Sequence, residues 1–226
     1  MGGGIEHRRN GFICYNYAMI SLSVIAIIIG FALAIMVHES SHAYVADYLG
    51  DPTARMEGRI SLNPLRHIDP IGSILIPGLL LLSGTGIMFG WAKPVPINPF
   101  NLRNPSRDRF LVALAGPISN FVLGAIFAVL ARFMPTSSNF PMLFLYIAQV
   151  NFMLMMFNLI PIPPLDGSAV LPLIFKNNAA LLYNMEKQGF VYLVGLLILD
   201  SVTNGMIMNL IVRVPVEAFI KVFFGG

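Results

Sequence analysis

Long apolar stretches separated by short polar connections are the feature that most constrains how this chain can fold. A helix needs about 20 apolar residues to cross a bilayer, and five stretches reach or approach that length: residues 17–37, 70–92, 110–131, 142–160 and 188–212. Only 11% of the residues are charged, against about 25% in soluble proteins. The sequence therefore predicts one all-α membrane domain over residues 1–226, a polytopic bundle of about five transmembrane segments.

Two connections among the first three segments are predicted to be short extended or β elements. Residues 53–63 show some alternation of polar and apolar side chains, as a strand does. Residues 88–99 contain prolines at 94, 96 and 99, which favour an edge strand or an irregular loop. The stretch 70–92 is interrupted by Pro77 and several glycines, so it either bends or crosses only part of the membrane.

His38, Glu39 and His42 form an H-E-x-x-H motif directly after the first apolar stretch. Residues four apart on a helix project in the same direction, so the two imidazoles can bind one metal ion. Glu39 lies next to them, where a general base for a metal-bound water is needed. Charged groups are costly at membrane depth, so this cluster indicates a functional site.

A catalytic zinc ion usually has three protein ligands and one open position. His38 and His42 supply two, and the third must come from elsewhere in the fold. Asp47 lies nine residues beyond His38, about two and a half turns along the same helix, which is too far for one ion. The remaining candidates are His67, Asp69, Asp166 and Asp200.

Asp166 is the favoured third ligand. It follows a long apolar helix and a run of three prolines, at positions 161, 163 and 164, which cannot continue a helix. Gly167 comes next and permits unusual backbone dihedrals. A carboxylate at the end of a broken helix can be directed into a cavity within the membrane.

With these motifs in place, the chain resembles the site-2 protease family of intramembrane zinc metalloproteases. The similar segments are H-E-S-S-H-A at 38–43, F-G-W-A-K-P-V-P-I-N-P at 89–99, G-P-I-S-N at 116–120 and N-L-I-P-I-P-P-L-D-G at 158–167. The resemblance implies that His38, His42 and Asp166 bind Zn²⁺ and that Glu39 is the base. It also implies that Asn120 helps at the oxyanion or the substrate backbone, although a helix–helix hydrogen bond is the competing interpretation.

The expected function is zinc-dependent endoproteolysis of transmembrane segments in other proteins. A helical substrate must unwind before its backbone can be cut, and strand pairing would hold the unwound part. We expect that edge in residues 55–62 or 89–97, with Val95 and Ile97 in contact with substrate. The resemblance implies a multi-pass protein of a prokaryotic cell membrane, with the site reached from the cytoplasmic face. The basic residues form no dense patch with interleaved aromatics, so no nucleic-acid partner is expected.

Several alternatives stay open. A transporter with a zinc site is disfavoured because no internal repeat is visible, and a non-catalytic scaffold is disfavoured because Glu39 is intact. His67 and Asp69 are interpreted mainly as a solvated boundary, and Asp200 as part of a polar pocket or a helix break. With five spans the Lys and Arg residues divide eight to six between the two faces, which leaves the orientation undecided.

Overall fold

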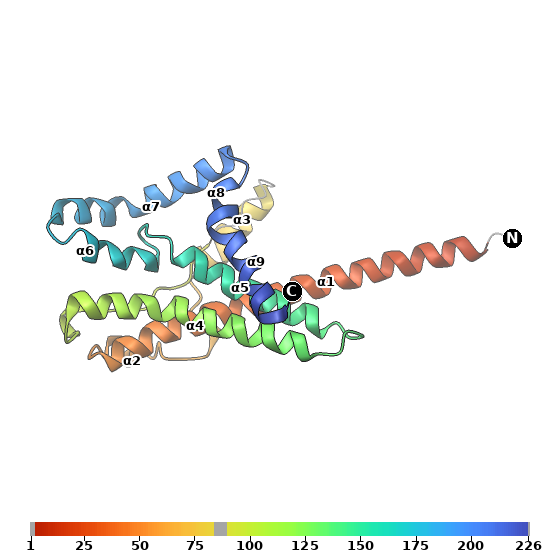
Figure 1. The fold of residues 1–226 in the computed structure, drawn as a ribbon, viewed down its shortest axis with the longest axis horizontal. Helices are drawn as coiled ribbons and strands as arrows, with labels where there is room; N and C mark the ends of the chain where they lie inside the picture. The colour runs from red at the N-terminus through yellow and green to blue at the C-terminus, as the bar shows by residue number, and fades with distance from the viewer. Residues whose placement is uncertain (1–2, 84–89, 226) are drawn as a thin grey trace.

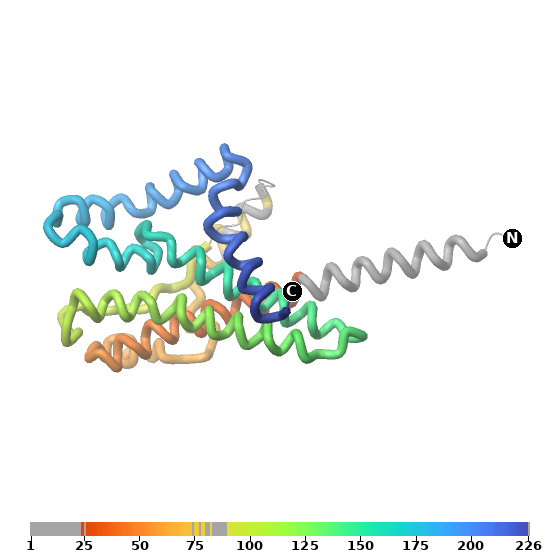
Figure 2. Tube along the Cα trace, in the orientation of Figure 1, coloured from red at the N-terminus to blue at the C-terminus, as the bar shows by residue number. Residues whose placement is uncertain are grey.

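The computed structural model describes residues 3–83 and 90–225 (Figures 1 and 2). Its main helices are α1 (Gly3–Tyr48), α4 (Pro105–Phe133), α5 (Phe140–Asn158) and α7 (Ala179–Val202). Shorter elements join them, among them α2 (Thr53–Met56), α3 (Ile76–Ser83), α6 (Leu171–Ile174), α8 (Met206–Met208) and α9 (Val214–Ile220). The described residues form no strand, so the all-α prediction is confirmed for them.

Helices α1, α4 and α5 form the bundle that carries the site. Helix α4 runs antiparallel to α1, and α5 runs parallel to α1 (Figure 1). Small residues allow the close approach that membrane helices need. A Cβ added at Gly30 of α1 would lie 3.1 Å from the Ile147 Cα atom of α5, and one at Gly124 of α4 would lie 2.8 Å from the Phe152 ring. Larger residues at these positions would push the helices apart.

Among the described residues, three helical stretches are long and apolar enough to cross a membrane: Ala26–Tyr48, Pro105–Phe133 and Phe140–Asn158. A fourth crossing is possible if α7 and the segment Met206–Gly225, which meet at a bend of 102°, count as one broken span. The predicted number of about five spans is therefore not confirmed. The difference concerns the second predicted span and the last one, which is bent.

The second predicted span, residues 70–92, does not form a single crossing. The backbone N–H of Arg103 donates a hydrogen bond of 3.3 Å to the carbonyl of Leu49, so the end of α1 and the start of α4 lie together. A chain that leaves and returns at one end of the bundle cannot cross once in between. Its described helical part is a π-turn (Pro70–Leu75) and α3, together shorter than the roughly 30 Å hydrocarbon layer at about 1.5 Å per residue. Residues 84–89 lie outside the described residues.

Of the two predicted extended connections, the first differs from expectation, and the described part of the second has the irregular form that its prolines favour. Residues 53–56 are the helical turn α2, because the Asp51 carboxylate accepts hydrogen bonds from the backbone N–H and the hydroxyl of Thr53. The prediction of a strand there is wrong. Residues 93–98, which we call the proline segment, form no ladder; Pro94 and Pro96 lack the N–H group that pairing would need. Phe89, where the second predicted edge begins, lies outside the described residues.

The chain after α5 is packed so that Asp166 is held near α1 and α4. One buried cluster joins α4, α5 and α9 through Phe152 and Val216. A second cluster packs Leu193 of α7 against Ile160 and Leu165, which flank the proline-rich loop. A Cβ at Gly189 of α7 would lie 2.5 Å from the Cβ atom of Pro163, so α7 closes directly on this loop.

Candidate metal centre

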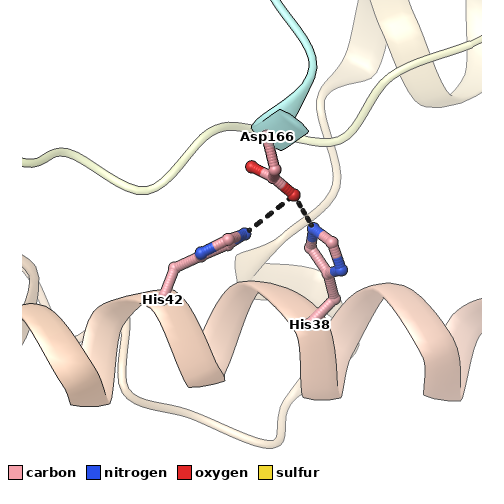
Figure 3. Close-up of side chains that lie close together, drawn as sticks. All are labelled: His38, His42 and Asp166. Carbon is pink, nitrogen blue, oxygen red and sulfur yellow. Dashed lines mark ion pairs between the residues drawn. The ribbon is translucent and has the colours of Figure 1, made fainter. Parts of the chain in front are cut away.

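His38 and His42 occupy successive turns of α1 and are almost fully buried. Helix α1 continues through the motif to Tyr48. The two imidazole rings lie 4.6 Å apart, nearly perpendicular to each other. Their Nε2 atoms therefore face a common point at the side of the helix (Figure 3).

Asp166 reaches that point from the loop after α5, at the start of a short 3₁₀ helix (Asp166–Val170). Its Oδ2 atom lies 3.0 Å from His38 Nε2 and 3.4 Å from His42 Nε2 (Figure 3). Gly167 makes this approach possible, because a Cβ there would lie 2.3 Å from the carbonyl oxygen of Leu159. Helix spacing and the loop together bring three donor groups from distant parts of the sequence to one place.

Groups on helix α4 lie within hydrogen-bond distance of the Nδ1 atoms of both imidazoles. His42 Nδ1 lies 2.7 Å from the carbonyl oxygen of Val112. A carbonyl only accepts, so Nδ1 carries the proton and the Nε2 lone pair of a neutral ring is free. Asn120, fully buried, places its amide 3.2 Å from His38 Nδ1. Its Oδ1 atom has no partner; a half-turn of the amide would let Oδ1 accept the His38 Nδ1 proton and free Nε2 in the same way.

Gly116 of α4 leaves the space in which the donors meet. A Cβ at this position would lie 2.4 Å from His42 Nε2 and 2.6 Å from His38 Nε2. The nearest neighbours of this glycine are therefore atoms of the two imidazole rings. A glycine in the middle of a long helix, followed by Pro117, was the available signal.

The residues fit a zinc ion. Two imidazoles and one carboxylate are a donor set that catalytic zinc uses, and the three donor atoms all lie within 4.8 Å of one another. Ligands bound tetrahedrally at about 2.0–2.2 Å are roughly 3.3–3.6 Å apart, close to the two distances to Oδ2. The Oδ2 atom is buried and has no hydrogen bond. Burial raises the pKa of Asp166, but His38 and His42, when they carry a proton on Nε2, lower it by more, to about 2.

Glu39 lies on α1 between the two histidines in sequence and is half-buried. Within the described residues its carboxylate makes no hydrogen bond or ion pair. It is therefore available to exchange protons with a bound molecule.

None of the other ligand candidates joins this centre. Asp47 pairs with Arg55 at 3.3 Å, and Asp69 caps the backbone N–H groups of Ile71 and Gly72. Asp200 accepts a hydrogen bond from the N–H of Met208, which stabilises the bend after α7. His67 is buried and its Nε2 lies 2.7 Å from the Ser61 carbonyl, so its interpretation as part of a solvated boundary is wrong.

A separate groove of about 660 Å³ lies between α1 and α4. Its wall includes Ser40, Tyr44 and Ser119, but none of the three donor residues. Ser40 and Ser119 satisfy their hydroxyls on the carbonyls of Ser61 and Gly116. The groove is thus an apolar surface distinct from the metal centre.

Comparison with known proteins agrees with this geometry. The family model described as "Peptidase family M50" matches residues 134–202, which include Asp166 but not the two histidines. The chain is 36% identical over 193 residues to "Putative zinc metalloprotease YwhC" of Bacillus subtilis (strain 168), covering 80% of this chain and 81% of that protein. It is 32% identical over 184 residues to Rip2 of Mycolicibacterium smegmatis, which carries the same kind of name, covering 80% of this chain and 69% of Rip2. No solved structure is a significant match.

Two buried histidines on α1 and one carboxylate from the loop after α5, beside helices apolar enough to cross a membrane, are the centre that a membrane-embedded metallopeptidase needs. The chain belongs to peptidase family M50. It is a multi-pass zinc metalloendopeptidase with Zn²⁺ as its cofactor.

Proposed function

We propose that this chain is an intramembrane protease that cleaves transmembrane segments of other proteins. In this proposal His38, His42 and Asp166 hold the zinc ion and Glu39 is the general base. The observation that carries it is the meeting of these three donors beside helices α1 and α4, both long and apolar enough to cross a membrane. A site there acts on peptide bonds that lie within or close to the bilayer.

The residues of this chain divide the chemistry between them. Bound zinc would polarise the scissile carbonyl and acidify a water molecule. Glu39 accepts the proton of the attacking water and returns it to the leaving amine. Val112 and Asn120 fix the two imidazoles so that both Nε2 lone pairs point to the same place.

Asn120 acts on His38 and not on the substrate in this proposal. The contact of 3.2 Å to His38 Nδ1 supports that role. The oxyanion role implied by the family resemblance would require the amide to point away from the imidazole. Because it joins α4 to α1, this contact is the helix–helix hydrogen bond of the competing interpretation, with an imidazole of the metal centre as its partner.

The basic residues favour a cytoplasmic location for the loop end of the bundle, where α1 ends and α4 begins. Since both ends of residues 49–104 lie there, seven basic residues between positions 49 and 109 flank this end; they are Arg55, Arg59, Arg66, Lys93, Arg103, Arg107 and Arg109. At the other end of the bundle, Arg132 lies beside the connection between α4 and α5, and Arg8 and Arg9 precede the first apolar stretch. Positively charged loops stay on the cytoplasmic side, so we place the loop end there. The site would be reached from that side.

Val95 and Ile97 of the proline segment are the proposed substrate contacts. Their backbone N–H groups make no hydrogen bond within the described residues. Residues two apart in an extended chain present their N–H groups at the same edge. These two donors are thus suited to pair with the backbone of an unwound substrate.

The test is cleavage of a model single-span substrate by the detergent-purified protein and by its Glu39→Gln variant, with zinc measured in both. We expect zinc in both proteins and cleavage only by the parent, with a loss of about 100-fold or more. Zinc without cleavage by the parent would favour the transporter or scaffold alternatives. Cleavage that persists in the variant would refute the role of Glu39.

A further inference from the structure

Arg59 is a buried cation whose partners are all backbone carbonyls. Only 4% of its surface is exposed, and no carboxylate of the described residues lies within ion-pair distance of it. Its guanidinium donates hydrogen bonds to the carbonyls of Arg66, Lys93 and Pro94, the last at 3.0 Å. The mechanism proposed above does not use this residue.

A guanidinium can bond several carbonyl groups at once because its planar fork holds several donors in fixed directions. One terminal nitrogen of Arg59 bonds the Arg66 carbonyl, and the other bonds Lys93 and Pro94. The same side chain therefore joins the loop that follows α2 to the proline segment, 34 residues further along the chain. Burying a charge without a counter-ion is costly, and charge-assisted hydrogen bonds to three carbonyls offset that cost.

The far end of the proline segment is held by a buried group of opposite charge. Asp51 is fully buried, and its Oδ2 atom accepts a hydrogen bond of 2.6 Å from the backbone N–H of Asn98. Its Oδ1 atom accepts a bond of 2.9 Å from the side chain of Asn101. Arg59 and Asp51 thus hold the proline segment at its two ends, and no hydrogen bond of the described chain holds Val95 or Ile97 between them.

The positions of these bonds decide which edge of the segment is free. Each residue before a proline is restricted to extended conformations, which applies to Lys93, Val95 and Asn98. In an extended chain alternate residues face the same edge. Arg59 bonds the adjacent carbonyls of Lys93 and Pro94, so this alternation applies only beyond Pro94, where Asn98 faces the edge bonded by Asp51. Val95 and Ile97 face the opposite edge, which retains its N–H donors.

We propose that Arg59 is a positioning residue for substrate binding, which fixes the proline segment so that the N–H groups of Val95 and Ile97 are presented together. This inference rests on the proposed function, because it assigns the free edge to the substrate backbone. Arg59 acts through the segment and touches neither the substrate nor the metal centre. Its loss should weaken substrate binding and leave the chemical step intact.

The experiment compares Arg59→Gln and Arg59→Lys with the matched control Arg66→Gln. Arg66 is an exposed arginine of the same loop, and within the described part of the chain its side chain bonds only the Gly58 carbonyl. For each purified protein we would measure bound zinc, melting temperature, and kcat and KM for a single-span substrate. We expect Arg59→Gln to keep its zinc and raise KM by about tenfold, the equivalent of one hydrogen bond, with kcat within twofold of the parent. Arg59→Lys keeps the charge but not the fork, so it should be intermediate, and Arg66→Gln should match the parent.

A crosslinking readout separates positioning from general stability. In a Cys14→Ser, Glu39→Gln background, which removes the only natural cysteine, Ile97→Cys should form a disulfide with one cysteine position of the substrate and not with its neighbours. Adding Arg59→Gln should spread the crosslinks over several positions.

An unchanged KM and crosslink pattern in Arg59→Gln would overturn the inference. A parallel loss of zinc, kcat and melting temperature in both Arg59 variants would overturn it as well. If Arg59→Gln does not fold, a folded Arg59→Lys with the parent's KM and crosslinks would overturn it too. Failure of the parent to cleave would instead refute the proposed function.

Discussion

The metal centre and the proline segment are both held by buried polar side chains, but by different kinds of bond. In the metal centre, side chains from α1, from α4 and from the loop after α5 meet one another. In the proline segment, Arg59 and Asp51 bond mainly to backbone groups of an irregular chain. The first arrangement fixes the positions of reactive atoms. The second fixes the path of a chain that has no ladder or helix of its own.

This contrast indicates in which of the two regions an amino-acid substitution is tolerated. Each donor of the metal centre has a fixed place, so the loss of one removes the function of all. The proline segment is held at two separate ends, and the loss of one tie should loosen it without unfolding it. Substitutions in the two regions should therefore produce effects of different size and kind.

The largest effect should follow removal of the third donor of the metal centre. Asp166→Ala leaves two imidazoles on one helix, which bind zinc far more weakly than three ligands. We expect bound zinc to fall from about one per chain to near zero and cleavage to be lost, measured by elemental analysis and a substrate assay. Asp47→Ala is the control, since Asp47 is a carboxylate of α1 paired only with Arg55. Stoichiometric zinc in Asp166→Ala would show that another group completes the site.

A single methyl group beside the donors should be nearly as damaging. In Gly116→Ala the new Cβ would lie 2.4 Å from His42 Nε2, so the imidazoles or helix α4 must move. We expect zinc affinity, measured by competition with a chelator, to fall by about 100-fold. Gly195→Ala is the matched control in α7, because a Cβ there meets no atom within 4 Å. Equal zinc affinity in both variants would mean that Gly116 only assists packing.

Substitution of Asn120 should have an intermediate effect on zinc affinity, and it tests whether this residue acts on His38. Asn120→Leu removes the acceptor for the His38 Nδ1 proton, and we expect zinc affinity to fall by about 10- to 100-fold. Asn120→Asp keeps an acceptor oxygen and should bind zinc more tightly than Asn120→Leu. If Asn120→Leu lowers kcat with no change in zinc affinity, the oxyanion role is the correct one.

Substitutions in the proline segment should cause a smaller loss of cleavage rate and leave zinc binding unchanged. Val95→Pro or Ile97→Pro removes one N–H donor from the free edge, which should slow cleavage by about tenfold, as expected for one hydrogen bond. Val95→Ile, which keeps the N–H, should behave as the parent. Unchanged kinetics in both proline variants, with zinc retained, would reject pairing at this edge.

The metal centre was largely predictable because its information is local in sequence. The spacing of His38 and His42 follows from the helix repeat, and the prolines before Asp166 mark the point where a helix stops. What could not be predicted is the contact between Asn120 and His38, since a lone asparagine in an apolar helix has many possible partners. The reason for Gly116 was equally hidden, because it depends on how closely α4 approaches α1.

The connection between α1 and α4, residues 49–104, was predicted less well, for a physical reason. Arg59 and Asp51 lie among other charged and polar residues, and no periodicity marks them as buried. Their partners are carbonyl and N–H groups, which every residue carries, so sequence cannot indicate which ones they bond. The number of spans predicted for this region is not confirmed: apolar composition in residues 70–92 predicts a crossing, whereas the bond between Arg103 and Leu49 brings the chain back to the same end.

The smallest effect concerns the pH dependence of the hydrogen bonds that Asp51 accepts from Asn98 and Asn101. Burial raises the pKa of the Asp51 carboxyl, but hydrogen bonds from Thr53, Asn101 and Asn98 lower it by more, so its pKa is below the usual value. A carboxyl with a depressed pKa contributes stability above its unfolded pKa of about 3.9, and loses that contribution as the pH falls toward the folded value. We therefore expect the difference in melting temperature between the parent and Asp51→Asn to be constant above about pH 5 and to shrink below about pH 4. A difference that stays the same through this range would mean that the charge of Asp51 does not strengthen its hydrogen bonds to the proline segment.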